Sequence, residues 1–437
     1  MRRKANEPFF LTGLDIGTKK ISIVVMETDP VTSESHVISI GSVNSKGIKK
    51  GDIIEPDLCV ESIVNAIDKV ESSSMFVSDA ILSVGPSQVD SIILHETIRL
   101  REEGDYERPV TSSDMIDVVG EAISSARARS DECLLHAVPL EFSVDQSDFM
   151  PDPRGYKGTE LTVSLLAIFA PLKSIRDAVD CAEKAGLNVV GVIHKSISAG
   201  FGSLLPEEMD NGCVAVNIGA GTTSAAFFKD GKLQNLALFP IGGDQVTSDL
   251  ASVLGVPSIN AEYLKREVAL SESGEDLYDE LEFALDGKAF ITSVEEVLSI
   301  ISPRIEEILS RFLKPVIDSF GSEEAICSIV FSGGVAKTPG LLSYVEPFFG
   351  APARIGTPVD PSSLPLENRG SEFTSAVGIV NYFMEKENNP DLYLEPSLTD
   401  LVKEAEGSNG PITQGGKFIK KWREFIQALK NAFSELF

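Results

Sequence analysis

Two turns in this chain carry the residue types that bind phosphate groups. The first lies within FFLTGLDIGTKKISIVVM (9–26) and the second within CVAVNIGAGTTSAAFFK (213–229). Each joins two apolar strands through an Ile-Gly turn, whose successive backbone N–H groups can form a concave anion site. The hydroxyl groups of Thr18, Thr222 and Thr223 would add hydrogen-bond donors. The chemistry that this pattern indicates is phosphate binding.

Charged side chains beside the first turn fit the same chemistry. Asp15 directly precedes the turn, where a carboxylate could hold the water shell of a Mg²⁺ ion bridging two phosphates, and Lys20 could contact those phosphates as a cation. Alone, DIGTKK would more often be an ordinary charged hairpin tip. In a third segment, VFSGGVAKTPG (330–340), Gly333 and Gly334 follow a strand, where a nucleotide base needs close approach. Together the three segments predict nucleotide binding.

The elements that position these segments form two related halves. Because the hairpins begin about 200 residues apart, their similarity indicates two related lobes rather than a solenoid, whose repeats span tens of residues. Each lobe would bring its hairpin to a shared cleft. The acidic segment 258–320 is predicted to be mostly helical, with an interruption at Pro303. The other predicted helices are 57–71, 112–129, 172–186, 196–205 and 338–348, and the other predicted strands are 80–84, 90–100, 137–145, 161–169, 188–193 and 325–332.

Composition limits the class of protein. A chain of 437 residues exceeds the usual size of a single core, and its net charge of −28 disfavours nucleic acid as a partner. The five cysteines are scattered and never in a C-x-x-C pair, which disfavours a disulfide framework or a zinc site. The apolar run near the N-terminus is too short for a signal sequence, and no window of about 18 uncharged apolar residues could span a bilayer. The chain is therefore expected on the cytoplasmic side.

The segment 417–437 is amphipathic and net basic. Its apolar residues recur at steps of three and four and so form one stripe on a helix, and it carries five basic and two acidic residues. A polar, acidic tether (387–416) precedes it, which argues against the alternative of a helix docked on its own domain or on a partner. We predict a helix that lies in a membrane interface. The residues predicted to bind the membrane are Phe418, Lys421, Trp422, Phe425, Ile426, Leu429, Phe433 and Leu436.

The three glycine-containing segments resemble the first phosphate, second phosphate and adenosine motifs of the actin-like ATPase superfamily. Within it the chain is most similar to the FtsA family of bacterial cell-division proteins. PIGGDQVTSDLASVL (240–254), AEYLKRE (261–267) and TSAVG (374–378) match further blocks, and residues 136–163 resemble the end of the FtsA insertion subdomain. The nucleotide-binding residues implied by the resemblance are Asp15, which would also hold Mg²⁺ through water, and Gly17, Thr18, Lys19, Lys20, Asn217, Gly219, Ala220, Gly221, Thr222, Thr223, Gly242, Gly243, Glu262, Lys265, Gly333, Gly334 and Lys337.

The resemblance implies an α/β fold of the actin-like, two-lobed type, with two related α/β lobes around a nucleotide cleft and an FtsA-type small α+β insertion subdomain. The expected parts are the first lobe (1–84, 168–210 and 369–386), the insertion (85–167), the second lobe (211–255 and 321–368), its helical small subdomain (256–320), the linker (387–416) and the membrane-targeting helix (417–437).

One departure from the superfamily pattern bears on hydrolysis. Hydrolysing members usually have Asp where this chain has Asn217, which supplies no negative charge for placing Mg²⁺ and the attacking water. The superfamily's water-positioning Gln or Glu aligns near His194 and Lys195, neither of which is a carboxylate or an amide. ATP is therefore expected to act mainly as a structural ligand, with weak ATPase activity at most.

The function implied is that of an actin-like ATP-binding protein that forms filaments on the cytoplasmic face of the membrane and anchors the FtsZ ring at the division site. The expected partners are the FtsZ C-terminal peptide, further copies of the chain, an anionic membrane surface and other division proteins. Two alternatives remain at this point: an ATP-hydrolysing or phosphotransferring enzyme of the same superfamily, such as a sugar kinase, and an actin-like pilus-assembly adaptor.

Overall fold

A computed structural model places most of the chain between residues 9 and 388. The residues that it describes are 9–28, 35–71, 77–100, 107–126, 131–270, 279–285, 288–321, 325–359, 362 and 364–388. The predicted membrane-binding segment 417–437 and the predicted linker beyond residue 388 lie outside the described residues.

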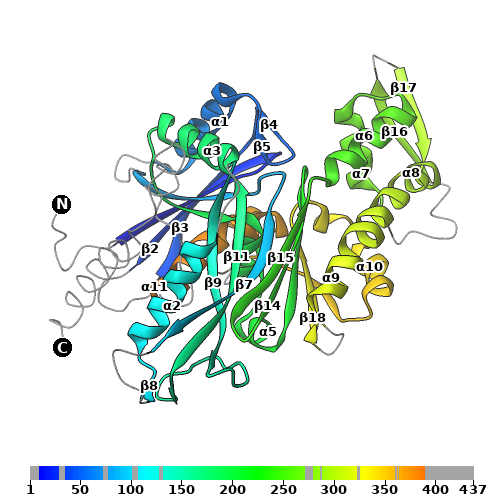
Figure 1. Cartoon of the computed structure of the whole chain (residues 1–437). Coiled ribbons are helices and arrows are strands. Elements are labelled where there is room, and N and C mark those ends of the chain that lie inside the picture. The colour runs from blue at the N-terminus through cyan, green and yellow to red at the C-terminus, as the bar shows by residue number, and fades with distance from the viewer. Residues whose placement is uncertain are drawn as a thin grey trace.

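The first lobe contains a five-stranded sheet in the order β12-β6-β1-β2-β3 (Figure 1). The predicted first hairpin is its centre, where β1 pairs antiparallel with β2 and parallel with β6. Ile21 and Ile23 face one core, while Val24 and Met26 face the other, so helices must cover both sheet faces. The strands are β1 (Phe9–Ile16), β2 (Lys20–Thr28), β3 (Ser35–Asn44), β6 (Asp79–Val84) and β12 (Asn188–His194), with a small ribbon of β4 (Ile48–Lys49) and β5 (Asp52–Ile53).

Four helices complete the first lobe. Two of them, α1 (Pro56–Val70) and α3 (Leu172–Lys184), cover one face. The other two, α4 (Lys195–Ser203) and α11 (Thr374–Asn388), pack against each other behind the hairpin, so the chain returns to the first lobe. The short helix α5 (Pro206–Asn211) leads to the second lobe. Gly186, at φ +97°, follows the end of α3 as a C-terminal glycine.

The second lobe repeats the arrangement with the sheet β15-β14-β13-β18-β19. Its central hairpin is β13 with β14, and β13 runs parallel to β18, as β1 does to β6. The duplicated design is therefore confirmed. The strands are β13 (Cys213–Ile218), β14 (Thr223–Lys229), β15 (Lys232–Phe239), β18 (Ser328–Ser332) and β19 (Ala353–Ile355), and the helices are α6 (Gly243–Leu254), α7 (Ser258–Glu267), α8 (Val294–Glu307), a π-helical segment (Ile308–Leu313), α9 (Lys314–Phe320) and α10 (Leu341–Phe349).

The acidic segment differs from its mostly helical prediction at residues 280–293. There β16 (Glu280–Leu285) and β17 (Lys288–Ser293) form an antiparallel hairpin. Phe283 and Phe290 stack on its inner side with ring centroids 4.9 Å apart, whereas Glu280 and Glu282 are exposed. This alternation has the period of a strand, but the acidic composition hid it. Pro303 lies within α8, and the helical course continues through the π-helical segment to Phe320.

The insertion subdomain is a three-stranded sheet, β7-β11-β9, covered by α2. In Figure 1 it lies below the first lobe, with β7 beside β15 of the second lobe. A capping box between Thr111 and Asp114 starts α2, as the TSSD motif predicts. Its elements are β7 (Asp90–Arg99), β8 (Arg108–Pro109), α2 (Ser112–Ser125), β9 (Glu132–Val144), β10 (Lys157–Gly158) and β11 (Glu160–Pro171).

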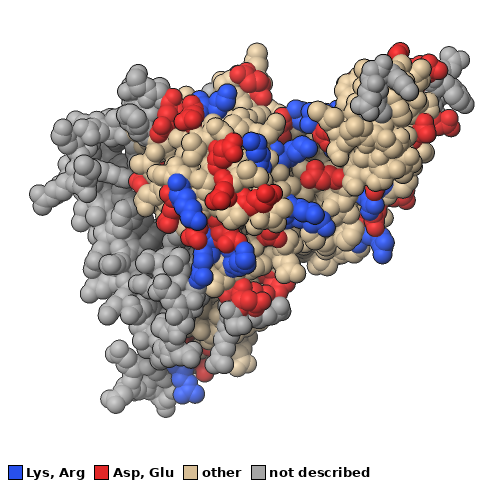
Figure 2. Space-filling model, turned by 90° about the horizontal axis from the view of Figure 1, so that it is seen from above, with Lys and Arg blue, Asp and Glu red and all other residues tan. Residues whose placement is uncertain are grey.

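The surface mixes both signs of charge. Figure 2 shows Lys and Arg interspersed with Asp and Glu on the face seen from above. Among the described residues, ion pairs join such opposite charges, for example Arg108 with Asp114 at 2.6 Å and Arg304 with Asp249 at 2.6 Å. Many of the basic side chains are therefore already paired with acidic ones.

Candidate nucleotide cleft

The two glycine-containing turns meet between the lobes. In the first, the Gly17 amide donates to the Lys20 carbonyl at 3.1 Å, and in the second the Gly219 amide donates to the Thr222 carbonyl at 2.9 Å. A Cβ atom placed on Gly221 would lie 2.5 Å from Thr18 Oγ1, so the tip of one turn touches the other. The duplicated hairpins thus bring both predicted phosphate turns to one place.

Lys20 is a buried cation that lacks a hydrogen-bond partner. Its Nζ atom has no partner among the described residues and lies 3.3 Å from the centroid of the Phe373 ring. Burial lowers the pKa of Lys20 to about 8, against the opposing effects of Glu372 and Asp15. A buried, unsatisfied ammonium group is costly, and an anion beside the turn would satisfy it.

Asp15 pairs with a residue from far along the chain. Lys195 Nζ lies 2.8 Å from Asp15 Oδ1 and donates to Oδ2 at 3.0 Å. The Asp15 side chain is 4 % exposed and that of Lys195 17 %. Lys195 was not among the predicted nucleotide-binding residues, although the sequence resemblance placed the superfamily's water-positioning residue near it.

The neighbouring His194 is wholly buried and faces away from solvent. Its Nδ1 atom accepts from the Ser196 amide at 3.3 Å, and its own amide donates to His136 Nε2 at 3.0 Å. Burial lowers the pKa of His194 to about 3, so the imidazole is neutral. His194 therefore supports the start of α4 and offers no base to the cleft.

The side chain of Asn217 bonds to a neighbouring strand of the second-lobe sheet. Its Nδ2 atom donates to Ser332 Oγ at 3.0 Å, across the parallel pair of β13 and β18. The side chain is neutral and buried. It therefore supplies no charge for a metal ion.

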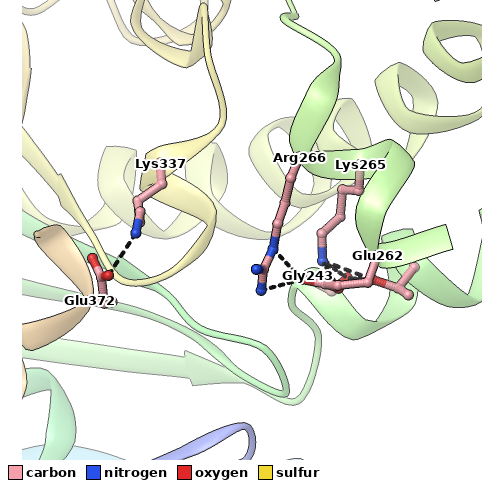
Figure 3. Close-up of polar contacts among 7 residues, drawn as sticks. Gly243, Glu262, Lys265, Arg266, Lys337 and Glu372 are labelled. Carbon is pink, nitrogen blue, oxygen red and sulfur yellow. Dashed lines mark hydrogen bonds and ion pairs between the residues drawn. The ribbon is translucent and has the colours of Figure 1, made fainter. Parts of the chain in front are cut away.

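Glu262 and Lys265 lie on one face of α7 and join the start of α6. Lys265 Nζ donates to Glu262 at 2.6 Å, to Thr247 Oγ1 at 2.8 Å and to the Gly243 carbonyl at 3.2 Å. Burial lowers the pKa of Lys265. Burial alone would raise the pKa of Glu262, but the bonds from Lys265, Thr247 and Arg266 outweigh it and lower that pKa. Figure 3 shows this cluster beside the separate pair of Lys337 and Glu372.

The third glycine segment follows β18 and lies against β13. Gly333 has φ +89°, and a Cβ atom there would lie 2.5 Å from the Ile218 carbonyl oxygen, so only glycine fits between the strands. At Gly334 nothing lies within 4 Å of such an atom. Lys337 Nζ donates to Glu372 Oε1 at 2.7 Å, and this bond helps to lower the pKa of Glu372 against the effect of burial. Because no atom lies near the place of a Cβ atom on Gly334, the backbone there is open.

The second turn is continuous with the N-terminus of α6. The Gly243 amide donates to the Gly219 carbonyl at 2.9 Å, and the Asp244 amide donates to the Ala220 carbonyl at 2.8 Å. Gly242, the N-cap of α6, is thereby held against the turn.

Lys19 is exposed at the tip of the first turn. The predicted membrane-binding residues lie outside the described part of the chain.

Solved structures share this architecture. A PilM-PilN type IV pilus biogenesis complex matches at TM-score 0.61 and 17 % identity over 86 % of this chain and 98 % of that chain. MreB5 of Spiroplasma citri bound to AMPPNP matches at TM-score 0.51 and 13 % identity, over 88 % of this chain and 100 % of that chain. At these identities the likeness shows the fold alone. The fold is the two-lobed fold of the actin-like ATPases.

Sequence comparison identifies the family within this class. The family model "Cell division protein FtsA" matches residues 214–378, and "SHS2 domain inserted in FTSA" matches residues 87–169. The FtsA of Rhizobium meliloti is 30 % identical over 96 % of this chain and 94 % of its own length. The FtsA of Pseudomonas aeruginosa is 27 % identical over 94 % of this chain and 97 % of its own length. The chain belongs to the FtsA family of cell-division proteins.

Proposed function

We propose that this chain is an ATP-binding, filament-forming protein that attaches to the cytoplasmic face of the membrane and anchors the FtsZ ring at the division site. Membership of the FtsA family supports the role in division. The single observation in the cleft that favours a nucleotide is the buried ammonium group of Lys20, the residue that ends the first turn, which has no hydrogen-bond partner among the described residues. A bound phosphate would satisfy it.

ATP would lie across the seam between the lobes. Its phosphates would contact the turns at Gly17 and Gly219, and its ribose and base would approach the cluster of Glu262 and Lys265 and the open backbone at Gly334. Contacts from both lobes would stabilise the closed arrangement, which would couple nucleotide binding to filament formation.

Mg²⁺ held through Asp15 fits this arrangement poorly. Lys195 already neutralises that carboxylate, donating to Oδ2 and lying 2.8 Å from Oδ1, and Asn217 is neutral and bonded to Ser332. No base that could activate water is found among these residues. Weak turnover at most is proposed, and phosphate release at about one per second or faster would contradict it.

The FtsZ C-terminal peptide would bind in the small subdomain of the second lobe. A groove of 680 Å³ lies between α6, α8 and the π-helical segment. Its lining combines the apolar residues Val253, Ile300 and Pro303 with Arg304 and Arg311, whose charges are paired in the same groove with Asp249 and Glu307. The apolar residues would bind apolar side chains of the peptide, and its acidic groups would compete with Asp249 and Glu307 for the two arginines.

The terminal helix would supply reversible membrane attachment. Among the described residues no helix is long and apolar enough to cross a membrane. A single amphipathic helix binds lipid weakly, but a filament presents many copies together, and their combined avidity would be much greater. Filament assembly would thus control attachment.

Co-sedimentation with anionic vesicles and ATP tests the proposal. The full chain is compared with a version that ends at Gly416, each with and without a labelled FtsZ C-terminal peptide. We expect the full chain to carry the peptide to the vesicles and the truncated chain to leave both in solution. Val253→Asp should abolish peptide recruitment but not lipid binding, whereas Ile259→Asp, at a site 79 % exposed and outside the groove, should change neither. Lipid binding by the truncated chain would refute the membrane anchor, and failure of the peptide to sediment would refute the FtsZ role.

A further inference from the structure

We propose that the ammonium group of Lys195 takes the place of a divalent cation at Asp15, so that this chain binds nucleotide phosphates without Mg²⁺. The inference rests on the nucleotide binding proposed above and assigns Lys195 as a phosphate-binding residue. The Mg²⁺ ion expected at Asp15 does not fit the residues present there.

The position of Lys195 is fixed at both ends of its side chain. The residue is the first of α4, and its Cβ and Cδ atoms would lie 3.3 Å and 3.4 Å from a Cβ atom on Gly85, so its aliphatic part packs along that backbone. Its Nζ atom lies 3.0 Å from the place of a Cβ atom on Gly17 and within 3.0 Å of both Asp15 oxygens. The ammonium group therefore lies between the carboxylate and the predicted phosphate turn.

The local charges favour an anion there over a metal. A Mg²⁺ ion at Asp15 would have to displace Lys195 and leave its largely buried ammonium group beside a second cation, Lys20. A phosphate group would meet both ammonium groups without any rearrangement of charge. The electrostatic role that Mg²⁺ usually has beside β- and γ-phosphates would fall to a side chain.

Two other carboxylates of the proposed site, Glu262 and Glu372, are also paired. Glu262 is bonded to Lys265 and Arg266, and Glu372 is bonded to Lys337. Among the described residues, moreover, no cluster of three His, Cys, Asp or Glu side chains could hold a metal ion. The cleft thus has no uncompensated carboxylate among Asp15, Glu262 and Glu372 to attract one.

Calorimetric titration of the full chain with ATP tests the assignment. We expect the dissociation constant in EDTA to lie within about twofold of that in excess Mg²⁺. Lys195→Met keeps the aliphatic packing but removes the charge, so it should weaken binding about tenfold or more in EDTA and regain most of this with Mg²⁺. Lys173→Gln removes an exposed lysine of α3 and serves as the matched control, with wild-type affinity in both buffers.

The possible failures can be told apart. Wild-type protein that binds ATP only with Mg²⁺, or Lys195→Met that binds like wild type in both buffers, overturns the role of Lys195 and leaves nucleotide binding in place. Wild-type protein that binds ATP in neither buffer overturns nucleotide binding itself.

Thermal unfolding without nucleotide gives a second, independent readout. Lys195→Met leaves the Asp15 carboxylate buried and unpaired, so its melting temperature should fall and Mg²⁺ should raise it. The double variant Asp15→Asn/Lys195→Met has no buried charge at this point and should regain stability without any response to Mg²⁺. Equal responses of wild type and Lys195→Met to Mg²⁺ would contradict the proposal.

Discussion

Gly221 offers the most direct test of whether closure of the two lobes governs nucleotide binding. A Cβ atom on this residue would lie 2.5 Å from Thr18 Oγ1, 2.8 Å from Lys50 Cα and 3.0 Å from the Lys50 amide nitrogen. Ordinary contacts are longer than about 3.4 Å, and the Lys50 contacts are backbone atoms that cannot rotate away. Gly221→Ala should therefore raise the free energy of the closed arrangement by about 1–3 kcal/mol, the usual cost of overpacking.

The free-energy cost of the clash should weaken ATP binding and should not lower the stability of either lobe. Both partners of the clash belong to the first lobe and Gly221 to the second, so a small opening of the cleft relieves it. If ATP binds the closed arrangement, its affinity should fall about 5- to 150-fold by calorimetry, while the melting temperature without nucleotide changes little. Gly191→Ala is the control, because its Cβ atom would meet only Ile81 at an ordinary 3.6 Å.

Two results would refute this reasoning. Gly221→Ala that binds ATP as tightly as wild type would show that closure at this contact is not required for binding. A large fall in melting temperature without nucleotide would show that the contact stabilises the fold as a whole rather than its closed state.

Four further predictions concern Lys20, Trp422 and Asp114. Because burial holds the pKa of Lys20 at about 8, ATP affinity should fall as the pH rises through 8, with proton uptake seen by calorimetry in buffers of different ionisation heat; Lys20→Arg should remove this fall. The same lowered pKa means that the unfolded chain binds more protons than the folded chain between pH 8 and pH 10.5, so stability without nucleotide should rise with pH in that window, and an unchanged melting temperature there would contradict it. Trp422→Glu should detach the full chain from anionic vesicles in co-sedimentation while leaving ATP affinity unchanged, and a loss of both would point to misfolding instead. Asp114→Asn breaks the bonds from Arg108 that hold the pKa of Asp114 low and that join α2 to β8, so hydrogen exchange in residues 112–125 should accelerate, consistent with a loss of about 1–3 kcal/mol; unchanged exchange would contradict it.

The sequence predicted the elements whose signals are local. The two hairpins have an alternating or continuous apolar pattern around an Ile-Gly turn, and the capping box at Thr111 and the glycine after α3 mark helix ends within a few residues. The hairpin of β16 and β17 was missed, since its exposed glutamates gave the segment the composition of a solvated helix. Phe283 and Phe290 each lie in a short stretch whose side chains alternate with a period of two. Only a search for that period would have predicted that the two rings pair.

The pairing of charges in the cleft was beyond sequence reasoning. Asp15 and Lys195 are separated by 180 residues, and only the fold of the first lobe brings β1 and the start of α4 together. Sequence analysis can note that Lys195 stands where a water-positioning residue is usual, but not that its ammonium group reaches across to the carboxylate. Long-range pairs of this kind depend on register and packing, which local patterns do not encode.

The net charge of the chain does not predict the charge of the cleft, because the charged side chains of the cleft come from distant segments. The whole chain carries −28, yet the proposed site sets six basic side chains against four carboxylates, namely Lys19, Lys20, Lys195, Lys265, Arg266 and Lys337 against Asp15, Asp244, Glu262 and Glu372. Partial burial strengthens these local interactions, whereas solvent and salt screen the distant surface acids. An acidic protein can therefore present a cationic cleft to a polyphosphate, provided that its bases come from separate segments that only the folded lobes assemble.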